Sequence, residues 1–136
     1  MPRVSMLLQL LILSLATLGC SVPGPDDRIP ASTSTEVKLT IDTGEPKVTT
    51  AKVPYAEKMT VRDVLRAAEA QGITSAYEGE GEGAMLQSLQ GIGNEGGGKE
   101  AKNWIYYVNG KQGTTSSAVY SLQPGDAIIW RFEKYE

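Results

Sequence analysis

The clearest candidate chemistry in this 136-residue chain lies in an aromatic run, NWIYYVNGK, at residues 103–111. Trp104, Tyr106 and Tyr107 are flat rings, which can stack on a planar macrocycle or a sugar while a tyrosine hydroxyl orients it. If the run is a strand, alternation places Trp104 and Tyr106 on one face and Tyr107 on the other. The three rings therefore cannot form a single platform, and the sequence does not say which face is buried.

Two explanations of these rings remain open. In the first, they fill a core or pair across strands with Trp130 or Phe132. In the second, the outward rings line a shallow apolar groove together with the loop at 94–102 and the segment at 85–90. The second explanation makes five residues ligand-binding candidates: Met85, Gln87, Trp104, Tyr106 and Tyr107.

The composition argues against catalysis, metal binding and nucleic-acid binding. The chain has no histidine and one cysteine, so the usual general base and the commonest metal ligand are missing. The acidic stretch EGEGEG at 78–83 lacks the Asp and Asn ligands of a calcium loop. The net charge is −3, with no cluster of basic residues. We therefore expect no catalytic residues, no metal site and no nucleic-acid partner.

The N-terminus has the features of an export signal. Arg3 precedes a mostly apolar run of 13 residues, from Met6 to Leu18, that ends at Gly19 and the single cysteine, Cys20. Such a run is shorter than the roughly 20 residues of a membrane-spanning helix. We assign residues 1–19 to a signal peptide.

The stretch ATLGC resembles the lipobox of bacterial lipoproteins, although Thr17 stands where that motif usually has leucine. The resemblance implies that Cys20 becomes lipidated and anchors a protein of the bacterial cell envelope, facing the periplasm or the exterior. The alternative is an ordinary signal peptide with an incidental cysteine. Residues 20–35 begin with the candidate lipidated cysteine and are rich in proline and small polar residues, so we expect them to form a flexible tether.

The pattern of apolar and polar residues over 36–136 predicts an α+β domain. We expect a hairpin over 36–53, a helix capped by Thr60 and stopped by Gly72, and a short strand over 73–77. A strand with a bend at Gly91 should follow. The aromatic strand then turns at Asn109-Gly110, a strong hairpin signal. A strand over 118–122, a Pro124-Gly125 turn and a final strand complete the expected fold: one helix packed on a mixed sheet.

Four segments in order carry a resemblance to a known family: MTVRDVLRAA (59–68), LQSLQGIG (86–93), NWIYYVNGK (103–111) and VYSLQPGDAIIWRF (119–132). Together they resemble DUF4430, a domain similar to the C-terminal domain of transcobalamin and intrinsic factor. The resemblance covers about residues 36–135 and implies a β-grasp-like fold of the soluble-ligand-binding kind. In transcobalamin-type proteins this domain closes over cobalamin held mainly by a helical domain, which has no counterpart here.

The sequence thus supports two hypotheses of function. The first is a membrane-tethered envelope module that binds a soluble ligand, with cobalamin or a related corrinoid as the candidate and no certain cofactor. The second is an interaction module without a small ligand, which docks an envelope protein through a sheet edge or an aromatic face. A concave groove lined by Met85 and the rings would favour the first, and a flat face with an unpaired edge would favour the second.

Overall fold

The structure, a computed structural model, describes residues 35–136. The predicted signal peptide, Cys20 and all but the last residue of the predicted tether lie outside the described residues. Between residues 35 and 136, no helix is long and apolar enough to cross a membrane.

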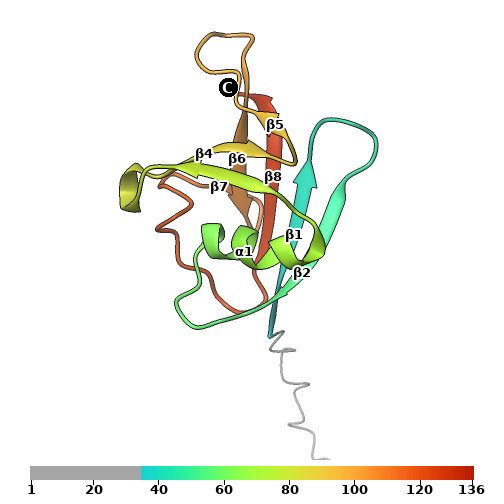
Figure 1. The fold of residues 1–136 in the computed structure, drawn as a ribbon, viewed down its shortest axis with the longest axis vertical. Helices are drawn as coiled ribbons and strands as arrows, with labels where there is room; N and C mark the ends of the chain where they lie inside the picture. Colours follow the sequence, from blue (N-terminus) through green and yellow to red (C-terminus); the bar gives the residue numbers. More distant parts are fainter. Residues whose placement is uncertain (1–34) are drawn as a thin grey trace, which may run out of the picture. The chain divides into compact units, whose positions relative to one another are not determined.

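A five-stranded mixed sheet forms the base of the domain (Figure 1). Its order is β2-β1-β8-β6-β7, in which β1 and β8 run parallel and the other neighbours run antiparallel. The bounds are Glu36–Asp42 for β1, Thr49–Pro54 for β2, Lys102–Val108 for β6, Lys111–Gln112 for β7 and Ala127–Lys134 for β8. A first hairpin followed by a helix, with the first and last strands parallel at the centre, is the β-grasp-like arrangement that the sequence predicted.

The register of the sheet places its apolar side chains on one face. Leu39 lies beside Ile128, Val108 also pairs with Ile128, and Tyr106 pairs with Trp130. Since residues at paired positions share a face, these side chains and their period-two neighbours point the same way. The buried residues that this sheet contributes to the core are Val37, Leu39, Ile41, Ala51, Val53, Trp104, Tyr106, Val108, Ile128 and Trp130.

Helix α1 (Val61–Ala68) covers part of this face. Thr60 begins it with a capping box, in which its hydroxyl accepts from the Asp63 N–H and the Asp63 carboxylate accepts from the Thr60 N–H. A 3-10 turn, η1 (Glu69–Gln71), and Gly72 at φ 85° end it. The predicted cap and stop are confirmed.

A second, three-stranded sheet lies on the same side of the large sheet as α1, and Figure 1 shows β4 crossing in front of β6 and β8. It consists of β3 (Ser75–Glu78), β4 (Met85–Leu89) and β5 (Ile92–Gly93), with a 3-10 turn, η2 (Gly81–Gly83), before β4. The predicted bend at Gly91 is a tight hairpin turn, because Gln90 and Gly91 both have positive φ, 52° and 77°.

The Asn109-Gly110 turn is confirmed by positive φ values of 50° at Asn109 and 82° at Gly110. The Asn109 side chain also forms two hydrogen bonds at the start of β8. Its amide nitrogen donates to the Asp126 carboxylate at 2.8 Å, and its amide oxygen accepts from the Ala127 N–H at 2.9 Å. Asn109 therefore makes one turn and also bonds to the residues that follow the Pro124-Gly125 turn.

The predicted strand over 118–122 is wrong. The Ser116 hydroxyl accepts from the Ala118 N–H, and the Ser116 carbonyl accepts from the N–H groups of Val119 and Tyr120, which closes a turn. The next backbone groups bond to the start of the helix: the Val61 N–H donates to Tyr120, and the Leu122 N–H donates to Met59. The only strand-like pairing of this segment is a single bridge between Thr60 and Ser121.

Candidate functional site

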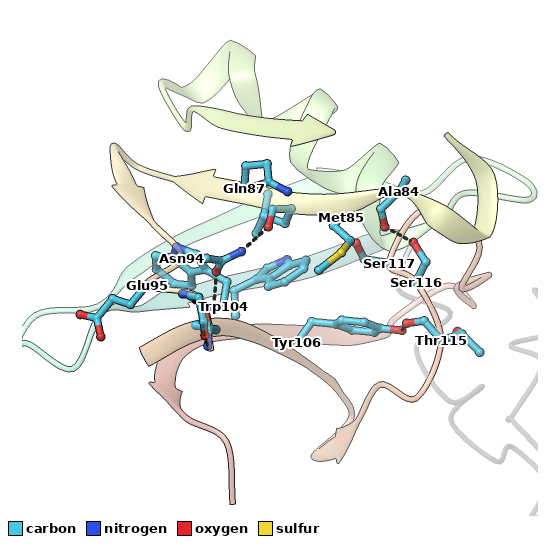
Figure 2. A pocket seen from close by; sticks show the side chains of 14 residues that line it. Ala84, Met85, Gln87, Asn94, Glu95, Trp104, Tyr106, Thr115, Ser116 and Ser117 are labelled. Atoms are coloured by element: carbon cyan, nitrogen blue, oxygen red, sulfur yellow. Dashed lines mark hydrogen bonds between the residues drawn. The ribbon is translucent and has the colours of Figure 1, made fainter. Parts of the chain in front are cut away.

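A cavity of about 520 Å³ lies between β4, β6 and the segment at 115–117 (Figure 2). We call it the aromatic cavity. It is lined by Ala84, Met85, Leu86, Gln87, Asn94, Glu95, Gly96, Asn103, Trp104, Tyr106, Thr115, Ser116, Ser117 and Trp130. Ligand pockets typically measure roughly 300–1,000 Å³, so the space suits a small molecule.

The rings of Trp104 and Tyr106 line the cavity from β6, and both are fixed by hydrogen bonds. The Trp104 indole N–H donates to the Ile92 carbonyl at 2.8 Å. The Tyr106 hydroxyl donates to the Thr115 carbonyl at 2.6 Å. These bonds tie the large sheet to the two segments that border the cavity, so the ring orientations are set before any ligand arrives.

Both rings also pair with rings on β8. The Trp104 and Phe132 centroids are 5.2 Å apart, and those of Tyr106 and Trp130 are 5.3 Å apart. Trp104 and Tyr106 each expose 7% of their surface. The core explanation and the binding explanation are therefore compatible here, because the same two rings belong to the buried core and also line the cavity.

Gly113 allows the Tyr106 ring to lie where it does. A Cβ atom at Gly113 would meet Tyr106 Cζ at 1.9 Å and the hydroxyl oxygen at 2.4 Å. The Gly113 N–H also donates to the Tyr106 carbonyl at 2.9 Å. Any side chain at position 113 would push the ring from its place, so this glycine is part of the site.

Met85 borders the mouth of the cavity (Figure 2) and exposes 63% of its surface. It is one of four exposed large hydrophobic residues among those described, with Val48, Val119 and Tyr135. A flexible, polarizable thioether over aromatic rings is well suited to contact an apolar ligand. Gln87, two residues further along β4, is half-buried and supplies an amide to the same rim.

The polar rim is held by side chains that the sequence analysis did not name individually, although it placed the loop at 94–102 beside the groove. Asn94 donates to the Leu86 carbonyl at 2.6 Å and accepts from the Trp104 N–H at 2.8 Å, which joins β4 to β6. The Ser116 hydroxyl donates to the Ala84 carbonyl at 2.6 Å on the other side. Asn94 stands at the start of the glycine-rich loop, and nothing in its sequence context distinguishes it from an ordinary turn residue.

Behind the rim, Ser117 is buried and shares a hydrogen bond of 2.8 Å with the Tyr77 hydroxyl. The Arg62 guanidinium lies 4.6 Å from the centre of the Tyr77 ring. Burial raises the pKa of Tyr77 to about 12, against the lowering effect of Ser117 and Arg62. Burial likewise raises the pKa of Tyr106. Both hydroxyls therefore stay protonated at neutral pH and serve as neutral hydrogen-bonding groups.

Among residues 35–136, Glu95 is the only charged residue that lines the aromatic cavity. Its carboxylate accepts from the Lys102 N–H at 2.7 Å. No group of three or more His, Cys, Asp or Glu side chains placed to hold a metal occurs within residues 35–136. The cavity combines apolar rings with neutral hydrogen-bonding groups, so its chemistry suits recognition of an uncharged molecule.

Four of the five predicted ligand-binding residues, Met85, Gln87, Trp104 and Tyr106, line this cavity. Tyr107 does not, which corrects its assignment to the same groove. It projects from the opposite face of β6, where its hydroxyl donates to Glu133 and the Arg131 guanidinium lies 5.0 Å from its ring centre. The groove is thus bordered by the inward rings of β6, whereas the sequence analysis assigned it to the outward ones.

The sequence matches the family model described as "Domain of unknown function (DUF4430)" over residues 59–134. This stretch includes α1, the second sheet, β6 and β8, and it contains all four segments that suggested the resemblance. The chain belongs to the DUF4430 family. A search of curated protein sequences found no match.

Two solved structures share the fold of this DUF4430 domain at low sequence identity. One is a candidate metal-binding protein from Ruminococcus gnavus ATCC 29149, with a TM-score of 0.59 and 15% identity over 75% of this chain and 99% of that one. The other is haptocorrin in complex with Cbi, with a TM-score of 0.60 and 16% identity over 74% of this chain and 25% of that one. The domain therefore corresponds to about a quarter of the haptocorrin chain.

Proposed function

We propose that this DUF4430 domain binds a soluble ligand in the aromatic cavity, as a module anchored in the bacterial cell envelope through Cys20. The observation that carries the proposal is the cavity itself: two fixed rings, Trp104 and Tyr106, under an exposed methionine and within a rim of neutral polar groups. Such a site can hold an apolar ring by contact and orient it by a few hydrogen bonds.

A corrinoid is the candidate ligand that the comparisons support. Haptocorrin in complex with Cbi contains a part with this fold, although the shared identity of 16% speaks for the fold alone. A planar macrocycle with an uncharged periphery is compatible with aromatic rings and with a cavity in which the described part of the chain places one charged residue, Glu95. A space of about 520 Å³ would contact one side of such a molecule rather than enclose it.

The test is a calorimetric titration of the full chain, in detergent, with cobalamin and cobinamide. Met85→Ala should weaken binding by about tenfold, because it removes an exposed thioether whose burial by the ligand would contribute roughly 1–2 kcal/mol. Val48→Ala is the matched control, since Val48 is also an exposed apolar residue, 44% exposed, and lies outside the cavity. If neither corrinoid produces heat at high micromolar concentration, the corrinoid version of the proposal is wrong.

The anchor has a separate test in bacterial cells. Cys20→Ser should move the protein from the membrane fraction to the soluble fraction, because a lipidated cysteine would supply most of the membrane affinity. Ser21→Ala is the neighbouring control and should leave the fractionation unchanged. Membrane association that persists in Cys20→Ser would contradict lipidation at this residue.

Docking of a protein by strand addition, the alternative function, has less support at the two ends of the large sheet. β7 has only two residues. On β2, the Lys52 carbonyl already accepts from the Gln71 side chain at 2.8 Å, and the strand ends at Pro54, which has no N–H to donate. Lysine, proline and a covering side chain are features that protect a sheet edge from pairing.

A further inference from the structure

The hydrogen-bonding pattern of β6 determines which of its backbone groups face away from β8. The Asn109 N–H donates to the Ala127 carbonyl at 2.8 Å, directly after the pairing of Val108 with Ile128. In an antiparallel pair, bonded and non-bonded positions alternate. Ile105 and Tyr107 therefore bond to β8, whereas the backbone groups of Lys102, Trp104 and Tyr106 point toward the outer edge of the sheet.

Most of these outward groups have partners. The Lys102 N–H donates to the Glu95 carboxylate, and its carbonyl accepts from the Glu95 N–H. The Trp104 N–H donates to Asn94, and the Tyr106 carbonyl accepts from Gly113. Two groups remain, the Trp104 carbonyl and the Tyr106 N–H. They point away from β8, β7 pairs only with Tyr107 and Val108, and none of the loop, turn or side-chain hydrogen bonds found within residues 35–136 includes either group. We call them the open edge pair.

A second cavity, of about 490 Å³, lies along this edge. We call it the edge cavity. It is lined by Asn103, Trp104, Ile105, Tyr106, Gln112, Gly113, Thr114 and Tyr135. Because side chains of a strand alternate between faces, a cavity that touches four consecutive residues must run beside the backbone rather than over one face. The open edge pair therefore borders the edge cavity.

The edge cavity and the aromatic cavity adjoin each other. Asn103, Trp104 and Tyr106 line both. A ligand that lies against the rings of the aromatic cavity can thus extend a substituent around Trp104 and Tyr106 to the open edge pair. None of the eight residues that line the edge cavity carries a charge at neutral pH, so a charged substituent would lose its hydration there without gaining an ionic partner.

The open edge pair offers one acceptor, on the residue before Ile105, and one donor, on the residue after it. In a sheet, a neighbouring backbone satisfies such groups with the N–H and C=O of its own amides. An extended peptide would need further groups along the edge, but Asn94 already occupies the Trp104 N–H and Gly113 occupies the Tyr106 carbonyl. The edge thus has room for one amide unit rather than for a strand.

We propose that the open edge pair of β6 binds an amide group carried by an uncharged ligand whose ring lies in the aromatic cavity. This inference rests on the proposed function and adds the chemical class of the ligand: a neutral ring compound with carboxamide substituents. The Tyr106 N–H donates to the amide oxygen, and the amide N–H of the ligand donates to the Trp104 carbonyl. An ester supplies only the first of these bonds, and a carboxylate carries a charge that the edge cavity does not balance.

The first test needs no ligand. In hydrogen exchange followed by NMR on the ¹⁵N-labelled full chain in detergent, the Tyr106 amide should exchange at least about tenfold faster than the amides of Ile105 and Tyr107, which bond to β8. An alternating pattern of this kind within the middle of β6 would show that the edge is open. Equal protection of the three amides would overturn the inference.

The second test compares benzamide, methyl benzoate and benzoate as probes on the same sample. Benzamide should move the Tyr106 amide proton downfield and bind roughly three- to tenfold more tightly than methyl benzoate, the difference expected for one hydrogen bond. Benzoate should bind more weakly than benzamide. Thr114→Phe, which fills the edge cavity from an exposed position, should remove the preference for the amide, whereas Thr50→Phe, at an exposed position on β2, should leave it unchanged.

The outcomes separate this inference from the proposed function. If benzamide shifts the Trp104 indole signal while the Tyr106 amide stays in place, or if the ester binds as tightly as the amide, the edge inference is wrong and the aromatic cavity stands. If the three probes and the corrinoids leave the signals of both cavities unchanged, the proposed function is wrong as well.

Discussion

The two faces of β6 carry similar residues but have different surroundings. Trp104 and Tyr106 on one face are buried beneath the second sheet, whereas Ile105 and Tyr107 on the other are half-exposed. A cavity also exists on the exposed face, about 490 Å³ in volume and lined by Tyr107, Glu133 and the C-terminal residues among others. The difference lies in the second layer: β4, β5 and the segment at 115–117 fix the rings of one face from above.

This comparison shows why aromatic content alone does not identify a site. The rings of Trp104 and Tyr106 are each bonded to a different segment of the chain, Ile92 and Thr115. Tyr107 instead bonds to Glu133 on the neighbouring strand of the same sheet. A ring held by its own sheet gains no partner above it. The cavity on that face is lined by several charged residues, whereas the cavity on the covered face combines fixed rings with mostly neutral polar groups.

Among the variants that test the difference between the two faces of β6, Trp104→Ala should have the largest effect. Truncation of a buried tryptophan leaves a cavity and an unpaired Ile92 carbonyl, and should lower the free energy of unfolding by about 4 kcal/mol. Ile105→Ala, the next residue on the half-exposed face, should cost only about 1 kcal/mol. Chemical denaturation of both variants measures the difference. Equal losses would mean that the two faces are equally covered.

Gly113→Ala should follow in size, with a loss of about 2 kcal/mol from overpacking. The new Cβ would overlap Tyr106 Cζ, so the ring must move, and the Tyr106–Thr115 hydrogen bond must lengthen or break. Gly97→Ala is the control, because no atom lies within 4 Å of a Cβ there. Thermal unfolding of the two variants is the measurement, and a Gly113→Ala protein as stable as the control would contradict the contact.

Much of the fold follows from local rules that act within a few residues. The capping box at Thr60, the stop at Gly72 and the turn at Asn109-Gly110 were all predicted from sequence, since caps and positive-φ turns depend on residue type at fixed offsets. The prediction of a strand over 118–122 is wrong for a local reason and a long-range one. Its apolar alternation is genuine, but Ser116 closes a turn, and the backbone then bonds to the helix start, which no local pattern announces.

The site was predictable in part. Met85, Gln87, Trp104 and Tyr106 were selected as large or polar residues beside an aromatic strand, and they line one cavity. Which face of β6 is covered depends on the second sheet, whose placement is a long-range contact, so the sequence could not separate Tyr107 from the residues that line the aromatic cavity. Gly113 could not be selected either, because its role is the space it leaves for a ring seven residues earlier.

Tyr77, which lies behind the rim of the aromatic cavity, should make the stability of the domain depend on pH in alkaline solution. Burial raises the pKa of Tyr77 from 10.0 to about 12, so the folded state holds this proton more tightly than the unfolded state does. Its contribution is complete below pH 10 and is lost as the pH rises from about 10 to 12. The free energy of unfolding should therefore fall by up to about 2 kcal/mol over this range. Tyr77→Phe, measured by urea unfolding at several pH values, should remove most of this slope; an unchanged slope would contradict it.

The smallest expected effect compares two hydroxyls on neighbouring residues. Tyr106→Phe removes the donor to the Thr115 carbonyl beside the cavity and should lower the free energy of unfolding by about 1 kcal/mol. Tyr107→Phe removes the donor to Glu133 on the half-exposed face, where water can replace it, and should cost less than about 0.5 kcal/mol.

The hydrogen bond to Glu133 is the main cause that raises the pKa of Tyr107, whereas burial is the main cause at Tyr106. Glu133→Gln should therefore lower the pKa of Tyr107 and leave that of Tyr106 in place, as measured by NMR titration of the tyrosine rings. A matching shift of both would mean that the two faces of β6 are electrostatically coupled through the sheet.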